Sequence, residues 1–236
     1  RLAKKHKPKM IISGFTAYPR TFEFKRVRQI ANKVAAYHMA DVSHIAGIVA
    51  GGAHPSPFPW TDVVMTTTHK SLRGPRGAIL FANRRSPIGK KRGVDIPTAI
   101  DKAVFPGLQG GPHDNVTLAK AQAFYEALQP DFKAYAHQIV KNAKALAKAL
   151  RSRGFDLISG GTDTHLILVD VRGMGVDGME AERRLERVGI IANRNSVPGD
   201  TSPFKPSGVR LGTPSLTSRG MKEKDMELVA ELIHKA

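Results

Sequence analysis

The chain has 236 residues, 41% of them hydrophobic, which is enough for one large domain or two small ones. It contains no cysteine, which excludes disulfide bonds and thiolate metal sites and fits a reducing compartment. No apolar run reaches the roughly 20 residues that span a bilayer, and no signal-peptide pattern is present. We therefore expect a cytoplasmic protein with no membrane segment.

The formal net charge of +17 is large, and much of it lies in two clusters that contain no acidic residue. Such clusters are typically solvated faces, or surfaces that meet an acidic region outside the chain. A nucleic-acid footprint is the alternative, which we do not favour because no aromatic residues are interleaved with the cations. The clusters are Arg1, Lys4, Lys5, Lys7 and Lys9 at the start of the chain, and Arg84, Arg85, Lys90, Lys91 and Arg92 further on.

The first half of the chain alternates strands and helices. Apolar residues recur at helical spacing through residues 22–34, between strand-like segments at 10–14 and 36–40. The order strand, helix, strand predicts a parallel, right-handed βαβ unit. This alternation is typical of an α/β domain with a mostly parallel sheet. Further strands are predicted at 63–65 and 77–83, an exposed insertion at 84–97 and a helix at 115–128.

The second half has a different order. Its clearest helix runs from Phe132 to Leu150, where apolar residues recur at three- and four-residue steps until Gly154 ends it. Strands and shorter helices follow in α+β order, and we place a domain boundary near Gln129. The predicted strands are 165–171, 190–193 and 208–211, and the predicted helices are 179–188 and 222–235.

Lys70 follows a short buried strand, Val63-Val-Met65, in a loop rich in glycine and arginine. Open α/β sheets bind ligands beyond the carboxyl ends of their strands. In a partly desolvated crevice beside other cations, the free amine of a lysine is favoured, and this form reacts with aldehydes to make imines. The alternative is a solvated loop cation, which is the usual environment of a lysine.

A second strand ends in a similar way, because Tyr37-His-Met-Ala-Asp41 is followed by His44. Two neighbouring strands would then deliver Asp41, His44 and Lys70 to one edge of a sheet. An imine-forming lysine and an aspartate for a pyridinium nitrogen are the parts that a pyridoxal 5'-phosphate site needs. His44 would stack on the ring or bind its phenolic oxygen. Taken singly, Asp41 could be a helix N-cap and His44 a packed histidine.

Four longer segments narrow the interpretation. They are Asp-Val-Ser-His-Ile-Ala-Gly at 41–47, Thr-Thr-Thr-His-Lys-Ser-Leu-Arg-Gly-Pro-Arg-Gly at 66–77, Val-Phe-Pro-Gly-Leu-Gln-Gly-Gly-Pro at 104–112 and Ser-Gly-Val-Arg-Leu-Gly-Thr-Pro at 207–214. In this order they closely resemble serine hydroxymethyltransferase, from about Pro8 to the last helix. The resemblance implies a fold type I, aminotransferase-like enzyme. Residues 1–129 would be the C-terminal part of its cofactor-binding large domain, and 130–236 its small α+β domain.

The resemblance also implies an activity and an assembly. Serine and tetrahydrofolate would be converted to glycine and 5,10-methylenetetrahydrofolate by a homodimer or a dimer of dimers, with pyridoxal 5'-phosphate as cofactor and tetrahydrofolate as cosubstrate. Lys70 would hold the cofactor, and Asp41 its ring nitrogen. Arg210, in a short strand between glycines, would bind the substrate carboxylate bidentately. An ion pair with an acid of the chain is the alternative for Arg210.

Other site residues follow from the resemblance alone. The glycine pair before Pro112 could bind an anion through its backbone, although a plain turn is the alternative. The implied roles are substrate specificity for His69, exchange of the imine partner for Thr67, proximity to the cofactor for Thr16 and Arg76, the phosphate of the partner subunit's cofactor for Gly111, and folate binding for Asn195, Ser202, Pro203 and Phe204.

Part of the family pattern is missing before Met10. That part carries a phosphate-binding loop and a glutamate expected to handle the serine hydroxyl, so we expect the chain to be the C-terminal portion of the enzyme and a poor catalyst alone. Two other functions stay open. One is a different enzyme of the same fold, such as a threonine aldolase or a glycine acyltransferase. The other is a basic RNA-binding module without catalysis.

Overall fold

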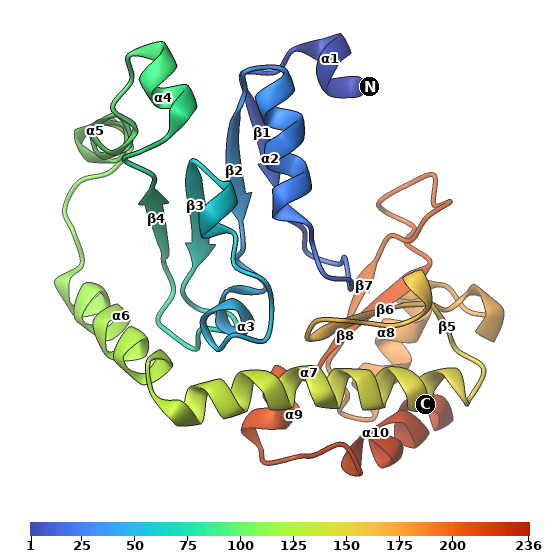
Figure 1. Cartoon of the computed structure of the whole chain (residues 1–236). Coiled ribbons are helices and arrows are strands. Elements are labelled where there is room, and N and C mark those ends of the chain that lie inside the picture. The colour runs from blue at the N-terminus through green and yellow to red at the C-terminus, as the bar shows by residue number, and fades with distance from the viewer. The chain divides into compact units, whose positions relative to one another are not determined.

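In the computed structural model, which describes residues 1–236, the chain divides into two units. Each unit has its own four-stranded sheet (Figure 1). Unit 1 comprises Arg1–Phe15, Phe22–Ala50 and Pro55–Gln129, and unit 2 comprises Thr16–Thr21, Gly51–His54 and Pro130–Ala236. No helix in either unit combines the length and the hydropathy needed to cross a membrane.

Unit 1 is built on a mixed sheet with the strand order β1-β2-β3-β4. The first three strands are parallel, and β4 runs antiparallel to β3. Parallel strands need a crossover of a dozen or more residues, and the loop of residues 68–77 is too short for one, so the chain returns antiparallel. The strands are β1 (Met10–Ser13), β2 (Tyr37–Asp41), β3 (Val63–Thr67) and β4 (Ala78–Ala82).

Helices connect and flank this sheet. The predicted βαβ unit is confirmed, because α2 joins the parallel strands β1 and β2 and buries Phe24 and Ala31. The basic lead-in before Met10, which carried no predicted element, contains a one-turn helix. The helical segments of unit 1 are α1 (Leu2–His6), α2 (Phe24–Lys33), α3 (Ala46–Ala50), η1 (Phe58–Trp60), α4 (Pro87–Arg92), α5 (Ile96–Lys102), η2 (Ala103–Leu108) and α6 (Asp114–Ala127).

The segment predicted as an exposed insertion at 84–97 is mostly exposed, and it also contains helices that the sequence interpretation did not name. It contains α4 and the first residues of α5. The Ser86 hydroxyl caps α4 by accepting a hydrogen bond from Gly89 N, and Pro87 occupies the first helical position. Gly93 ends the helix in a left-handed conformation. Ile88 is buried, so α4 belongs to the packed part of unit 1.

A buried polar network lies at the edge of the sheet where β2 and β3 begin. Asp62 is 1% exposed, and its Oδ2 accepts hydrogen bonds from His38 N (2.7 Å) and from the Arg28 guanidinium (2.7 Å). Its Oδ1 accepts from the Ser86 hydroxyl (2.6 Å). The carboxylate thus joins α2, β2 and the start of α4, and its charge is balanced by Arg28.

The His38 ring is held in one tautomer by this network. Nδ1 lies 2.7 Å from the Trp60 carbonyl oxygen, which can only accept, so Nδ1 carries the proton. Nε2 then accepts from the Ser13 hydroxyl at 2.8 Å. Burial lowers the pKa of His38 below its ordinary value, mainly because the charged ring would lose its hydration.

The lowered pKa of His38 predicts a pH dependence of stability. Because the unfolded chain takes up the proton more readily, the stabilisation is complete above about pH 6.5 and declines as the pH falls below it, by at most ~1.4 kcal/mol per pH unit. Urea unfolding at several pH values between 5 and 8 measures this slope. In a His38→Gln variant the slope below pH 6.5 should be smaller than in the parent protein. Equal slopes would contradict the prediction.

Unit 2 is built on an antiparallel sheet with the strand order β5-β6-β8-β7. Every residue of β6 is buried, as expected of a central strand. The strand predicted at 190–193 is wrong: pairing with β8 begins only at Asn193, and Ile191 is 81% exposed. The strands are β5 (Asp156–Leu157), β6 (Leu166–Asp170), β7 (Asn193–Asn195) and β8 (Gly208–Gly212).

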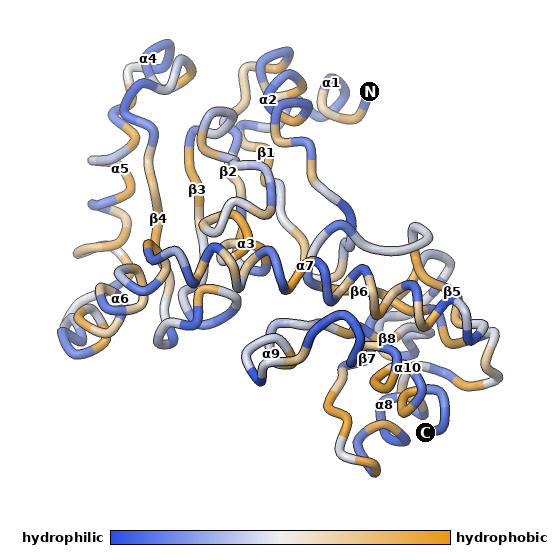
Figure 2. Tube along the Cα trace, turned by 60° about the horizontal axis from the view of Figure 1, so that its bottom comes forward, coloured by the Kyte–Doolittle hydropathy of each residue, from blue (hydrophilic) through white to orange (hydrophobic).

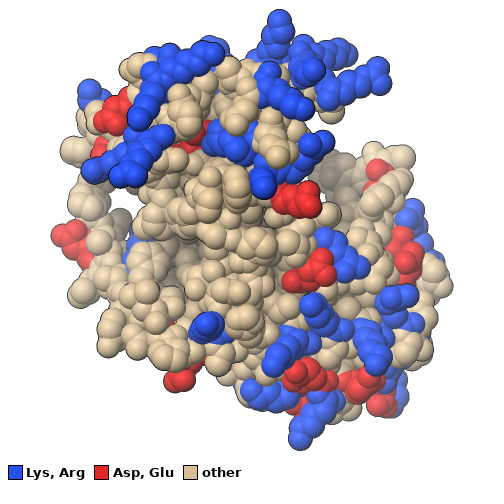
Figure 3. Space-filling model, viewed as in Figure 1, with Lys and Arg blue, Asp and Glu red and all other residues tan.

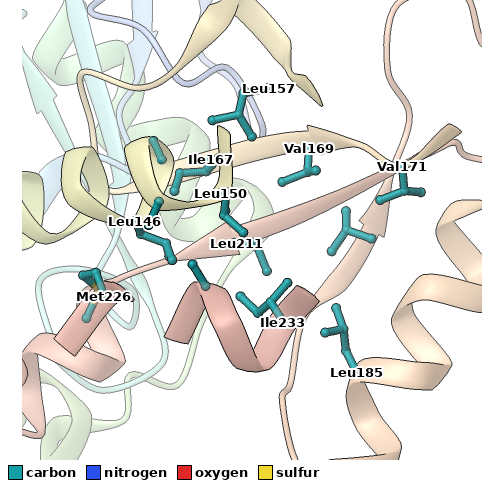
Figure 4. Close-up of a cluster of buried hydrophobic side chains, with 14 of the residues drawn as sticks. Leu146, Leu150, Leu157, Ile167, Val169, Val171, Leu185, Leu211, Met226 and Ile233 are labelled. Carbon is teal, nitrogen blue, oxygen red and sulfur yellow. The ribbon is translucent and has the colours of Figure 1, made fainter. Parts of the chain in front are cut away.

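The core of unit 2 lies between this sheet and the helices around it. α7 is amphipathic, with hydrophobic and hydrophilic residues alternating along its turns (Figure 2). Its buried side chains Leu146 and Leu150 pack with Ile167 of β6 and Met226 of α10 (Figure 4). The helical segments of unit 2 are α7 (Pro130–Arg151), η3 (Ile158–Gly160), η4 (Arg172–Met174), α8 (Gly178–Arg187), α9 (Pro214–Ser218) and α10 (Asp225–Lys235).

Candidate functional site

Asp41 is the last residue of β2, at the edge of the sheet where the three parallel strands end. Its Oδ1 accepts hydrogen bonds from the backbone N (3.0 Å) and the hydroxyl (2.5 Å) of Ser43. Its Oδ2 has no hydrogen-bond partner in the chain. α3 begins only at Ala46, so Asp41 does not cap it; instead the turn to Ser43 orients the carboxylate and leaves one oxygen available.

Ser43 links this carboxylate to the neighbouring strand. Its hydroxyl oxygen accepts a hydrogen bond from the backbone N of Thr67, the last residue of β3, at 3.1 Å. The Thr67 hydroxyl in turn accepts from Lys70 Nζ at 3.1 Å. A chain of hydrogen bonds therefore connects Asp41 to Lys70 through one serine and one threonine.

Lys70 is half-buried and lies three residues beyond the end of β3. No carboxylate of the chain lies within 4.0 Å of its Nζ, so the amine is not neutralised by an ion pair. The loop that carries Lys70 is closed by Thr68. Its N donates to Gly77 O (2.9 Å), its O accepts from Gly74 N (2.8 Å), and its hydroxyl donates to Pro75 O (2.6 Å). These three hydrogen bonds of Thr68 hold the loop that carries Lys70 in one conformation.

Two glycines allow the close approaches that set this geometry. A Cβ at Gly14, just after β1, would lie 2.6 Å from the Asp41 carbonyl oxygen, and a Cβ at Gly47 would lie 2.2 Å from the Ser71 carbonyl oxygen. Real Cβ atoms do not come this near to backbone. The lack of a side chain at these two positions therefore fixes the backbone next to Asp41 and next to Lys70.

The two histidines lie beside these groups. His44 is half-buried in the turn between β2 and α3, and its carbonyl oxygen accepts from the Ser71 hydroxyl at 3.1 Å. The same hydroxyl oxygen accepts from Gly47 N at 2.9 Å, which ties this turn to the Lys70 loop. His69 directly precedes Lys70, and its Nδ1 faces Gly77 N at 3.5 Å. Unit 1 thus brings Asp41, His44, Thr67, His69 and Lys70 to one edge.

The other residues of unit 1 named above lie in exposed loops. Arg76 is exposed in the loop before β4 and takes part in no ion pair. Gly111 is exposed between η2 and α6, with a φ of 55° that favours glycine. No atom lies within 4 Å of the place where its Cβ would stand, so its backbone is open to a ligand or another chain.

Arg210 is the central residue of β8 in unit 2 and pairs in register with Leu168 of β6 and Asn193 of β7. Its guanidinium donates to the Thr16 carbonyl oxygen at 2.7 Å. No carboxylate of the chain lies within 4.0 Å of it, so the structural ion pair considered above is absent. Partial burial lowers the pKa of the Arg210 guanidinium from its ordinary value. A half-buried arginine without a counter-ion is suited to an anionic ligand.

The residues expected at the folate lie around the end of β7. Asn195 is the last residue of that strand, and its side-chain amide donates to the Arg194 carbonyl oxygen at 2.9 Å. Ser202, Pro203 and Phe204 lie in the loop between β7 and β8, where the Ser202 hydroxyl accepts from Phe204 N at 3.2 Å. Phe204 is 84% exposed, an unusual position for a large apolar side chain.

Two serines with a positioning role were missed by the sequence interpretation. Ser43 joins the carboxylate of Asp41 to β3, and Ser71 joins the turn at His44 to the Lys70 loop. Ser43 follows Asp41 by two residues, the spacing of a turn in which an aspartate accepts from the backbone two residues on. That spacing could have indicated the first contact. The contacts of Ser71 have no such local signal, because its partners Gly47 and His44 lie 24 and 27 positions away in the sequence.

Comparison with known proteins extends these observations over nearly the whole chain. A family model described as serine hydroxymethyltransferase matches residues 1–233. The serine hydroxymethyltransferase of Rickettsia canadensis (strain McKiel) is 54% identical over 234 residues, which cover 99% of this chain and 54% of the relative. That of Acidobacterium capsulatum is 54% identical over 233 residues, which cover 98% of this chain and 52% of the relative.

The chain therefore spans about half the length of the curated relatives that it matches. The matched region contains both Lys70 and Arg210 and extends from the first residue almost to the last. Identity above one half across both units is far beyond what a shared fold alone would give. The chain belongs to the serine hydroxymethyltransferase family.

Proposed function

We propose that the chain supplies the cofactor-attachment and carboxylate-binding residues of a glycine hydroxymethyltransferase. This enzyme interconverts serine and tetrahydrofolate with glycine and 5,10-methylenetetrahydrofolate and uses pyridoxal 5'-phosphate. The observation that carries the proposal is the hydrogen-bonded chain from Asp41 to Lys70 across the ends of two parallel strands. Membership of the family supports it further.

The polar groups at the end of β2 and β3 fit the cofactor. Lys70 offers an amine that no carboxylate neutralises, and Asp41 offers a carboxylate oxygen without a partner in the chain. Lys70 Nζ would attach the aldehyde carbon, and Asp41 Oδ2 would accept from the ring nitrogen and keep it protonated. When bound, the cofactor withdraws electrons from the substrate Cα through its protonated ring. Ser43 would hold the Asp41 carboxylate in position for this contact.

Each remaining residue is proposed to bind or position. Arg210 would bind the carboxylate of the amino acid, and its bond to the Thr16 carbonyl would fix the guanidinium plane. Thr67, bonded to Lys70 Nζ, would hold the amine in position while one imine partner replaces another. His44 would stack on the ring, and His69 would contribute to substrate specificity. Arg76 would lie near the cofactor.

Two finer proposals concern the folate and the assembly. Asn195, Ser202, Pro203 and the exposed Phe204 would contact the folate, whose flat ring systems match an exposed aromatic side chain. Gly111, with an open backbone, would bind the phosphate of the partner subunit's cofactor in a homodimer. Under this proposal, residues 1–129 are part of the cofactor-binding domain and 130–236 form the small domain.

Reduction with borohydride tests the proposal, because it makes a bond between a lysine and the cofactor permanent. The cofactor-loaded chain is reduced, digested and mapped by mass spectrometry. We expect one labelled peptide, carrying the cofactor on Lys70. The label should disappear in a Lys70→Arg variant, which keeps the charge but removes the reactive amine.

Lys120 provides the matched control. It lies in α6 of the same unit, and its Nζ donates to the Ala78 carbonyl oxygen at 3.3 Å. A Lys120→Arg variant should be labelled as strongly as the parent chain. Label spread over many exposed lysines, or label that persists in the Lys70→Arg variant, would overturn the proposal.

A further inference from the structure

The two basic clusters of the sequence lie at the same end of the unit 1 sheet. α1 precedes the start of β1, and α4 follows the end of β4, which is antiparallel and returns to that edge. This is the edge at which β1, β2 and β3 begin, opposite the edge of Asp41 and Lys70. Figure 1 shows α1 and α4 beyond it, and α3 beyond the opposite one.

Contacts between the clusters pass through the start of β2. Tyr37 N donates to the carbonyl oxygen of Lys9 at 2.9 Å. Arg92 of α4 donates to the Ala35 carbonyl oxygen at 2.7 Å, and its guanidinium carbon lies 5.0 Å from the centroid of the Tyr37 ring. The Tyr37 ring thus contacts a cation of the second cluster, while its backbone pairs with the last residue of the first.

We call the surface formed by the two clusters, together with Lys33 at the end of α2, the basic edge. None of its side chains takes part in an ion pair, and all are exposed. On the face shown in Figure 3, Lys and Arg side chains gather over α1 and α4. Without these eleven cations, the formal net charge of +17 would fall to +6. They are Arg1, Lys4, Lys5, Lys7, Lys9, Lys33, Arg84, Arg85, Lys90, Lys91 and Arg92.

A pocket of about 360 Å³ opens at the same edge, between α2, η1 and α4. Trp60 lines it, together with Lys91 and the side-chain amides of Asn32 and Asn83. Arg28 lines it too, but its charge is paired with Asp62. These groups suit a nucleotide: an aromatic ring can stack on the base, amides can hydrogen-bond its edge, and the unpaired cation Lys91 can bind its phosphate. The pocket could thus recognise a base, in addition to the attraction of the cations for phosphates.

We propose that the basic edge and the Trp60 pocket bind single-stranded nucleic acid. The eleven cations would follow the phosphate backbone, and an unstacked base would enter the pocket. An acidic polypeptide would use the charge but leave the aromatic ring and the amides unused. A membrane surface would need an apolar face, and α1 offers only Leu2 as a large apolar side chain. Neither cluster contains an aromatic residue in sequence, but the fold places Tyr37 and Trp60 beside the second cluster.

The inference does not depend on the proposed enzymatic function, since it uses the opposite edge of the sheet. Trp60 is the only tryptophan of the chain and so reports on the pocket directly. The full chain is titrated with fluorescein-labelled 20-nucleotide oligo(U) RNA and with oligo(dT) DNA of the same length. Anisotropy follows binding, and quenching of Trp60 fluorescence follows entry into the pocket. Poly-L-glutamate of similar length serves as the comparison polyanion.

We expect both oligonucleotides to bind with simultaneous quenching of Trp60. With about six phosphate contacts, the affinity should fall on the order of 10²-fold between 50 and 200 mM salt. Tighter binding of RNA than of DNA would indicate that the 2'-hydroxyl is also contacted.

Two charge reversals of equal size locate the surface. Lys90→Glu combined with Lys91→Glu should weaken binding at least about tenfold, because two backbone contacts become repulsive. The matched control is Lys144→Glu combined with Lys148→Glu, which changes the net charge equally on the exposed face of α7 in unit 2 and should leave the affinity nearly unchanged. Thermal unfolding of both variants checks that they are folded.

Three results would overturn the proposal. The first is no binding of either oligonucleotide at 50 mM salt. The second is an equal loss in the two charge-reversal variants, which would mean that net charge alone is responsible. The third is binding of poly-L-glutamate as tight as that of the oligonucleotides with no quenching of Trp60, which would identify an acidic polypeptide as the partner.

Discussion

Replacing Asp62 by alanine is expected to lower the free energy of unfolding by about 3–5 kcal/mol, the usual cost of removing one partner of a buried ion pair. The carboxylate is 1% exposed and accepts from Arg28, from His38 N and from Ser86. Its removal leaves a half-buried guanidinium without its counter-ion and two buried donors without acceptors. Urea unfolding at pH 7.5, followed by circular dichroism, measures the loss.

Asp101 provides the matched control for this change. It is an exposed aspartate in α5 of the same unit, without an ion pair. Asp101→Ala should change the free energy of unfolding by no more than about 0.5 kcal/mol. An Asp62→Asn variant, which keeps the shape and one acceptor, should lie between the two. If Asp62→Ala cost no more than Asp101→Ala, the network around Asp62 would not be stabilising.

Replacing Arg210 by lysine is expected to weaken serine binding about 10²-fold, because the positive charge remains but the bidentate fork is lost. Arg210 has no carboxylate partner in the chain, so little folded-state stability depends on it. Titration of the cofactor-loaded protein with serine, followed by the absorbance of the cofactor, gives the dissociation constant. This readout does not require turnover.

Arg194 is the corresponding control, one strand away in β7. It is exposed and already paired with Glu182 at 2.5 Å, so its charge is satisfied within the chain. Arg194→Lys should leave serine binding unchanged within about twofold. Unchanged serine binding in Arg210→Lys would remove Arg210 from the proposed site, while the labelling of Lys70 would still stand.

The fold could be predicted where local patterns decide it. The helical stripe of α2 and the long apolar repeat of α7 are periodic, and both helices lie where the sequence places them within a few residues. The direction of β4 was not predicted, because residue pattern alone does not report strand direction. The helix within 84–97 was not predicted, although Ser86, Pro87 and Gly93 are ordinary helix start and stop signals.

The site was partly predictable for a different reason. Asp41 ends one short strand and Lys70 follows another, and parallel neighbours bring such ends together. The bonds through Ser43, Thr67 and Ser71 depend on the register between strands, which a single sequence does not specify. The same limit explains why Trp60 could not be associated with the basic clusters, since it is 24 residues from the nearer of them in sequence.

The absence of side chains at Gly14 and Gly47 has a consequence for how unit 1 tolerates substitutions. The spacing between amine and carboxylate is set by main chain touching main chain, not by the fit of apolar groups in the interior. Substitutions that loosen the interior of unit 1 can therefore reduce stability and yet leave the two reactive groups in register. Alanine at Gly14 or Gly47 would have the opposite effect. It would shift the backbone beside Asp41 or Lys70 while the apolar interior of unit 1 stays intact.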